Sequence, residues 1–133
     1  MTLQLSNVEL EHEGPIAIAV VSGEVDMSNA ASVREQISGS VSTNDEALVV
    51  DLTSLAFIDS AGLHVLFDLA AALSERRQHL RLIVPPGSQV ARAVEIVGLP
   101  RAISVDPDRE TALSSVLALG SESRPVPPGG ENP

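Results

Sequence analysis

The sequence contains neither cysteine nor lysine, and its aromatic residues are two phenylalanines. Without cysteine there is no disulfide framework and no thiolate metal site, which fits a reducing compartment. Without Trp or Tyr the chain cannot build a stacking platform for bases or sugar rings. The missing lysine excludes a Walker-type phosphate loop. It also excludes a receiver domain phosphorylated on aspartate, because such domains contact the phosphoryl oxygens with a lysine.

The sequence is strongly acidic. It has eighteen acidic and eight basic residues, for a net charge of -10. This balance repels nucleic acid and anionic membrane surfaces, so we expect neither as a partner. The sequence has no signal-peptide pattern and no apolar run of membrane-spanning length. We therefore expect a cytoplasmic protein that is a monomer when free.

Apolar periodicity divides the chain into alternating strands and helices. The predicted strands are residues 3–10, 16–22, 47–52, 80–84 and 101–105. The predicted helices are residues 28–40, 60–78, 88–99 and 106–120. Residues 121–133 are rich in Pro and Gly with almost nothing apolar, and they predict a disordered tail.

The order β-β-α-β-α-β-α-β-α predicts a single α/β domain over residues 1–120. We expect a mixed, mostly parallel sheet of about five strands, with about four helices and right-handed crossovers. Loops that leave the carboxyl ends of parallel strands meet at one edge of the sheet. The segments GEVD at 23–26 and FIDSAG at 57–62 both leave strands in this direction, so they should be neighbours.

The segment AFIDSAGLHVL at 56–66 is the candidate functional site, and enzymatic roles fit it poorly. Ser60 and His64 are one helical turn apart, but a nucleophile elbow needs glycine where Ile58 stands. The three histidines are not paired at a spacing used by zinc enzymes, and their simplest interpretation is solvated surface. We therefore expect neither an enzyme nor a metal site nor a cofactor.

A serine at a helix start can accept hydrogen bonds from free backbone N–H groups, and its loss costs about 0.5 to 2 kcal/mol. On this interpretation Ser60 is a helix cap. The same N–H groups and the positive end of the helix dipole also favour a phosphate there. Phosphorylation would add about -1.5 to -2 charges beside Asp59 and near Glu24 and Asp26.

The GEVD segment, the run VVDLTSLAFIDSAGLHVL and the order of elements together resemble the STAS domain of bacterial anti-sigma factor antagonists. The resemblance covers residues 3–119. It implies that Ser60 is phosphorylated by a cognate anti-sigma factor acting as a serine kinase. The unphosphorylated form would bind this kinase and release the sigma factor, and a phosphoserine phosphatase would restore it.

The resemblance also implies a partner-binding surface around the phosphorylation site. Its expected members are Glu24, Asp26, Asp59, Ala61, Gly62 and Leu63. Gly62 would allow close approach of the partner, and Leu63 would lie between core and contact surface. His64 departs from the family pattern, because many relatives carry glycine there. The alternative is a STAS subunit of a transporter or signalling complex that does not switch, with Ser60 acting only as a helix cap.

Overall fold

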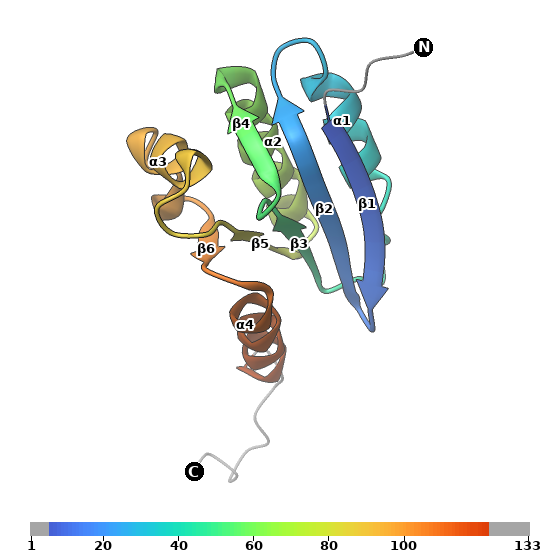
Figure 1. Ribbon diagram of the computed structural model, residues 1–133. Helices are drawn as coiled ribbons and strands as arrows, with labels where there is room; N and C mark the ends of the chain where they lie inside the picture. Colours follow the sequence, from blue (N-terminus) through green and yellow to red (C-terminus); the bar gives the residue numbers. More distant parts are fainter. Residues whose placement is uncertain (1–5, 123–133) are drawn as a thin grey trace, which may run out of the picture.

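The computed structural model describes residues 6–122 (Figure 1) and confirms the predicted α/β class and the alternation of strands and helices. The strands are β1 (Ser6–Glu13), β2 (Ile16–Val25), β3 (Ala47–Asp51), β4 (Leu55–Ile58), β5 (His79–Ile83) and β6 (Ser104–Asp106). The helices are α1 (Ala30–Ser38), α2 (Ser60–Glu75), α3 (Gln89–Ile96) and α4 (Arg109–Glu122), with a 3₁₀ turn η1 (Leu99–Arg101) before β6. The predicted tail lies outside the described residues, apart from residues 121 and 122 at the end of α4.

The sheet has the strand order β1-β2-β3-β5-β6, with β4 beside β2. β1 pairs with β2 in an antiparallel hairpin, and every other pairing is parallel. β3 pairs with the first half of β2, from Ile16 to Val20, and β4 pairs with its last residues. The long strand β2 therefore holds two shorter strands end to end along one side.

β4 is one strand more than the sequence analysis expected. The carboxylate of Asp51 accepts hydrogen bonds from the backbone N–H and the hydroxyl of Thr53 and so forms a turn directly after β3. The chain then resumes strand pairing against β2 at Leu55. Because the sequence between Asp51 and Ser60 lacks Gly and Pro, its pattern gave no sign of this break.

The predicted last strand also begins later than expected. Gly98 adopts a left-handed conformation with φ 71°, which ends α3, and Pro100 follows inside η1. Residues 101–103 therefore complete a turn, and the strand pairing starts at Ser104.

Alternate residues of the central strands enter two separate apolar clusters, one on each face of the sheet. On β2, Ala17 and Ala19 face the larger cluster, which α1, α2 and α3 complete. Ile16 and Ile18 face the smaller cluster, with Ala112 of α4. α1 and α2 lie behind the sheet in Figure 1, and α4 lies at its lower end. Every residue of β3 is buried because both faces are covered.

A buried ion pair joins β5 to β6. The Arg81 guanidinium donates two hydrogen bonds to the Asp106 carboxylate, at 2.7 and 3.1 Å. The two side chains are only 15% and 6% exposed. Removing one partner of such a pair leaves an uncompensated buried charge, which costs far more than the pair itself contributes.

We predict that Asp106→Ala lowers the free energy of unfolding by about 3 to 5 kcal/mol, because it leaves Arg81 charged and unpaired. The double variant Arg81→Met with Asp106→Leu should lose much less, since it removes both charges together. Urea denaturation of the two variants measures the difference. Equal losses in both would mean that the attraction itself, and not the abandoned charge, sets the cost.

Candidate functional site

Two loops meet at the carboxyl ends of β2 and β4, as the sequence analysis predicted (Figure 1). Glu24 pairs with Phe57, and Val25 pairs with Ile58. The backbone N–H of Asp59 then donates to the carbonyl of Val25 at 3.1 Å. The two segments are thus held together by backbone hydrogen bonds up to the first residue before α2.

The Asp59 carboxylate joins these two loops. Its Oδ1 accepts from the backbone N–H of Gly62 at 3.0 Å, which caps α2. Its Oδ2 accepts from the backbone N–H of Met27 at 3.1 Å, in the loop between β2 and α1. A single side chain therefore fixes both the start of α2 and the position of the neighbouring loop.

The N-cap of α2 is Asp59, so the prediction that Ser60 caps the helix is wrong. Asp59 has extended backbone angles, φ -103° and ψ -172°, whereas Ser60 is the first helical residue. A capping residue must lie one position before the helix with non-helical angles, so that its side chain can reach the N–H groups of the first turn. Position 60 does not meet this requirement.

Ser60 is exposed at the electropositive end of α2. Within residues 6–122 its hydroxyl has no hydrogen-bonding partner, since Asp59 supplies the cap. A change at this hydroxyl would therefore break no hydrogen bond to the described residues. His64, one turn further along α2, is exposed, and its Nε2 lies 3.6 Å from Oδ1 of Asp68.

The loop after β2 is ordered by its own side chains. Asp26 accepts from the hydroxyl of Ser28 at 2.6 Å and from its backbone N–H at 2.9 Å. Asn29 accepts from the Asp26 N–H and donates to the carbonyl of Glu24, both at 2.9 Å. The Ser28 hydroxyl, followed by the Ser28 N–H, lowers the pKa of Asp26 below its ordinary value. Asp26 is therefore an anion at neutral pH.

The predicted contact residues do not all lie at the surface. Glu24 is exposed, Asp26, Asp59 and Ala61 are half-buried, and Gly62 and Leu63 are buried. A Cβ on Gly62 would lie 2.6 Å from Cγ1 of Ile58 and 3.0 Å from Cγ1 of Val25. Glycine at position 62 thus lets α2 pack closely on β2 and β4, and Leu63 belongs to the apolar core.

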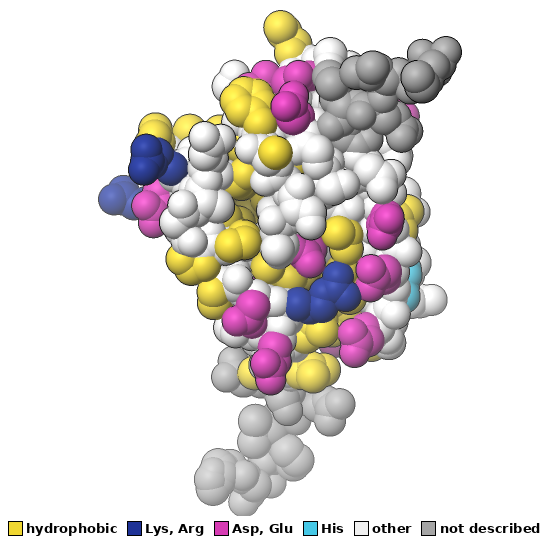
Figure 2. Space-filling model, viewed as in Figure 1, with side chains coloured by type: hydrophobic (Ala, Val, Ile, Leu, Met, Phe, Trp, Pro, Cys, Tyr) yellow, Lys and Arg dark blue, Asp and Glu magenta, His cyan; other side chains and the backbone are white. Residues whose placement is uncertain are grey.

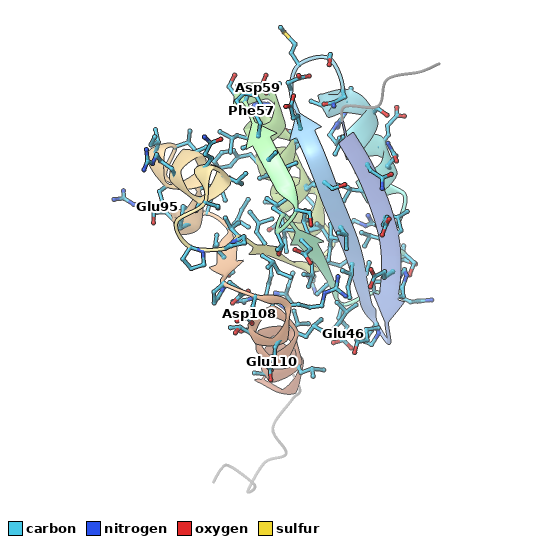
Figure 3. All side chains as sticks on the ribbon, in the orientation of Figure 1. Glu46, Phe57, Asp59, Glu95, Asp108 and Glu110 are labelled. Carbon is cyan, nitrogen blue, oxygen red and sulfur yellow. The ribbon has the colours of Figure 1, made fainter. Side chains whose placement is uncertain are left out.

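Two exposed apolar side chains lie on the two segments that Asp59 joins, and the sequence analysis missed both. Met27 is 83% exposed and Phe57 is 45% exposed. Figure 3 labels Phe57 directly beside Asp59, and Figure 2 shows apolar and acidic side chains together at this end of the molecule. A groove of about 350 Å³ continues from Phe57 to α3, lined by Phe57, Ile58, Gln89, Arg92, Ala93 and Ile96. Met27 could have been noticed as an apolar residue in a polar loop, whereas Phe57 lies in an apolar run whose pattern does not indicate which side chains are exposed.

All three histidines are exposed, as their interpretation as surface residues predicted, but His12 also has a partner. Its Nε2 lies 3.0 Å from Oδ2 of Asp45, a carboxylate that is only 5% exposed. Within the described range, no group of three or more His, Cys, Asp or Glu side chains is arranged to hold a metal ion. No helix in residues 6–122 is both long enough and apolar enough to span a bilayer.

Comparison with known proteins identifies the fold and the family. The STAS domain model matches residues 7–112. The chain belongs to the STAS domain family. The anti-sigma-F factor antagonist RsfB of Mycobacterium tuberculosis is 33% identical over 108 residues, which cover 80% of this chain and 84% of RsfB. The family predicted from the sequence is thereby confirmed.

Solved structures of other proteins have the same fold. The crystal structure of an anti-sigma factor antagonist from Mycobacterium paratuberculosis aligns with a TM-score of 0.75 at 25% identity, covering 84% of this chain and 93% of that one. The Bacillus cell fate determinant SpoIIAA in its phosphorylated form aligns with a TM-score of 0.58 at 21% identity, covering 83% and 99%. The second likeness shows that the STAS fold is shared at low sequence identity.

The capping role of Asp59 predicts unequal effects of two neighbouring substitutions. Asp59→Ala should lower the free energy of unfolding by about 1 to 2 kcal/mol, because it removes the cap and the bond to Met27. Ser60→Ala should change it by less than about 0.5 kcal/mol, since no hydrogen bond is lost. Chemical denaturation of both variants, with Asp59→Asn as the control that keeps an acceptor oxygen, measures the contrast. A larger loss for Ser60→Ala would contradict the assignment of the cap.

Because Gly62 is closely packed, the effect of Gly62→Ala on the free energy of unfolding should depend on the size of the side chains around it, Ile58 above all. Gly62→Ala should lower the free energy of unfolding of the STAS domain by about 1 kcal/mol, because the overlap with Ile58 outweighs the better helix propensity of alanine. In a background with both Ile58→Ala and Val25→Ala the same change should become stabilising, since the side-chain atoms nearest to the added methyl group are gone. A double-mutant cycle of unfolding free energies tests this. If Gly62→Ala changed the free energy of unfolding in the same direction in both backgrounds, the steric explanation would be ruled out.

Proposed function

We propose that this STAS domain is an anti-sigma factor antagonist that binds an anti-sigma factor serine kinase and is released when Ser60 is phosphorylated. The observation that carries the proposal is the exposed Ser60 hydroxyl, which has no hydrogen-bonding partner in the described part of the chain, at the first residue of α2. The relatives named above support it, since RsfB and the Mycobacterium paratuberculosis protein are both called anti-sigma factor antagonists. SpoIIAA supports the phosphorylated state, since this protein of the same fold has been solved in that form.

The arrangement of hydrogen bonds explains how Ser60 can be modified without unfolding the protein. Asp59 already occupies the N–H of Gly62, so the cap does not depend on the serine oxygen. A phosphate on Ser60 would lie at the positive end of the α2 dipole, which stabilises it locally. The modification therefore changes the surface and leaves the core packing intact.

The consequence for a partner is electrostatic. A phosphoserine adds about -1.5 to -2 charges beside the carboxylates of Asp26 and Asp59, which the loop structure holds in place. A partner surface that fits the unphosphorylated site would then have to desolvate a dense group of negative charges. Like charges brought together in an interface cost several kcal/mol, so the complex dissociates.

The proposed contact surface consists of exposed or half-buried residues around Ser60. Its members are Glu24, Asp26, Met27, Phe57, Asp59, Ser60 and Ala61. Met27 and Phe57 supply the apolar area that an interface centre needs, and the carboxylates form a polar rim. Gly62 and Leu63 support this surface from below, because both are buried in the free protein. A phosphoserine phosphatase would restore the binding form.

Phosphorylation of the purified protein tests the proposal directly. Incubation with a candidate anti-sigma kinase and labelled ATP should label the wild type at Ser60, located by mass spectrometry. Ser60→Ala should remain unlabelled and still bind the kinase, because the hydroxyl contributes little to the contact. Ser114→Ala changes an exposed serine on α4 and serves as the matched control. Labelling at another residue, or loss of binding in Ser60→Ala, would count against the switch and favour the subunit that does not switch.

Charge at position 60 provides a second, independent prediction. Ser60→Asp should weaken kinase binding at least about tenfold, whereas the isosteric but neutral Ser60→Asn should weaken it much less. Isothermal titration calorimetry measures both, and circular dichroism checks that the folds are unchanged. Equal affinities for Asp and Asn would mean that size and not charge ends the complex.

A further inference from the structure

A second cavity lies at the other end of α2 from Ser60. It has a volume of about 350 Å³ and is formed by the last turn of α2, the start of β5 and the segment before and within β6. Its lining residues are Ala70, Ser74, Arg77, Gln78, His79, Leu80, Ala102, Ile103 and Ser104. The proposed partner surface shares none of these residues, so this cavity is a separate feature of the fold.

The charge of this cavity differs from that of the rest of the protein. No acidic side chain lines it, although the chain as a whole carries a net charge of -10. Arg77 and His79 are exposed there, next to the hydroxyls of Ser74 and Ser104. Buried Ile103 and half-buried Leu80 add apolar surface. The cavity thus combines cationic and hydroxyl donors with an apolar wall.

Arg77 stands where the backbone favours glycine. Its φ is 60°, the only positive φ of a non-glycine residue in the described part of the chain. The N–H of Gln78 donates to the carbonyl of Leu73, and that of Arg77 donates to the carbonyl of Ser74, which closes α2 in a Schellman motif. Glycine adopts this left-handed conformation without steric cost, whereas arginine does not.

The Arg77 guanidinium has no carboxylate partner within residues 6–122, unlike the guanidinium groups of Arg81 and Arg109. A strained residue with an unpaired charge at the mouth of a cavity points to a role in binding rather than in folding. The folding of α2 would be served better by glycine at this position. The side chain of arginine is therefore the feature that needs an explanation.

Gln78 provides a further observation. The residue is buried, and its Nε2 donates at 2.8 Å to the carbonyls of Ser42 and Asp45. Its Oε1 is buried without a hydrogen-bonding partner among the described residues. This oxygen is closed off from the cavity and can only accept hydrogen bonds, so Gln78 fixes the turn after α2 and does not itself bind an anion.

From these features we infer that the cavity binds a small monocarboxylate with a short apolar chain. The planar guanidinium of Arg77 matches a carboxylate in bidentate geometry, and Leu80 and Ile103 fit an apolar body. One arginine suits one negative charge. The cavity adjoins the negative end of the α2 dipole, which opposes any anion but opposes a doubly charged phosphate more than a singly charged carboxylate, so a phosphate should bind worse.

Titration of the full chain with hexanoate, followed by ¹H-¹⁵N correlation spectra, tests the inference. Saturable shifts should be confined to the backbone amides of residues 74–80 and 102–104. Inorganic phosphate and 1-hexanol serve as the two comparison probes and should each bind at least about tenfold more weakly. Equal binding of phosphate would indicate nonspecific anion attraction, and equal binding of hexanol would indicate an apolar cavity alone. Either result, or the absence of saturable shifts with hexanoate, would overturn the proposal.

Arg77→Gly separates binding from folding. The variant should melt at a higher temperature than the wild type because glycine relieves the left-handed strain, yet it should bind hexanoate at least about tenfold more weakly. Arg34→Gln removes an exposed arginine on α1 and should leave both properties unchanged. Undiminished hexanoate binding in Arg77→Gly would exclude the guanidinium from the site. Phosphorylation of Ser60 is measured separately, so failure of this inference leaves the proposed function standing.

Discussion

The Asp59 carboxylate is the interaction on which the candidate site depends. One oxygen caps α2 and the other holds the backbone of Met27, so the helix start and the neighbouring loop have fixed positions relative to each other. Both loops also share the backbone pairing of β2 with β4. The result is a rigid acidic surface in which the Ser60 hydroxyl has no hydrogen-bonding partner among residues 6–122. A hydroxyl without such a partner can be modified with little change in the stability of the fold.

Close packing beneath the site has the same effect. Gly62 brings α2 against β2 and β4, where even one methyl group would overlap with Ile58. Leu63 and Leu66 then anchor the helix in the apolar cluster on this face of the sheet. Because interiors are packed as densely as crystals, a helix held in this way does not shift when charge is added at its tip. The proposed phosphate at Ser60 would therefore change the surface of the protein and not its core.

Helix α2 thus carries different chemistry at its two ends. Its first residue lies among carboxylates, and its last turn adjoins a cavity lined by Arg77 without any acidic side chain. The two ends also differ in how they are closed. Asp59 caps the first turn with a favourable extended backbone, whereas Arg77 closes the last turn in a conformation that favours glycine. The strained backbone at the last turn and the favourable cap at the first turn therefore indicate two separate sites.

The sequence by itself determined the α/β class, the order of elements and the position of Ser60 at a helix start, because these follow from apolar periodicity and strand alternation. It also placed the segments after β2 and β4 side by side, since parallel strands expose their carboxyl ends at one edge. Only the tertiary structure separated β4 from β3, assigned the cap to Asp59 and buried Gly62. The pairing of β4 with β2 and the contact of Gly62 with Val25 join residues more than 30 positions apart, which no local pattern encodes. The Asp59 cap is a local hydrogen bond to Gly62, but the second bond of this carboxylate, to Met27, is also long-range. The exposure of Met27 and Phe57 was decided in the same way, because the burial of an apolar side chain depends on which elements pack over it.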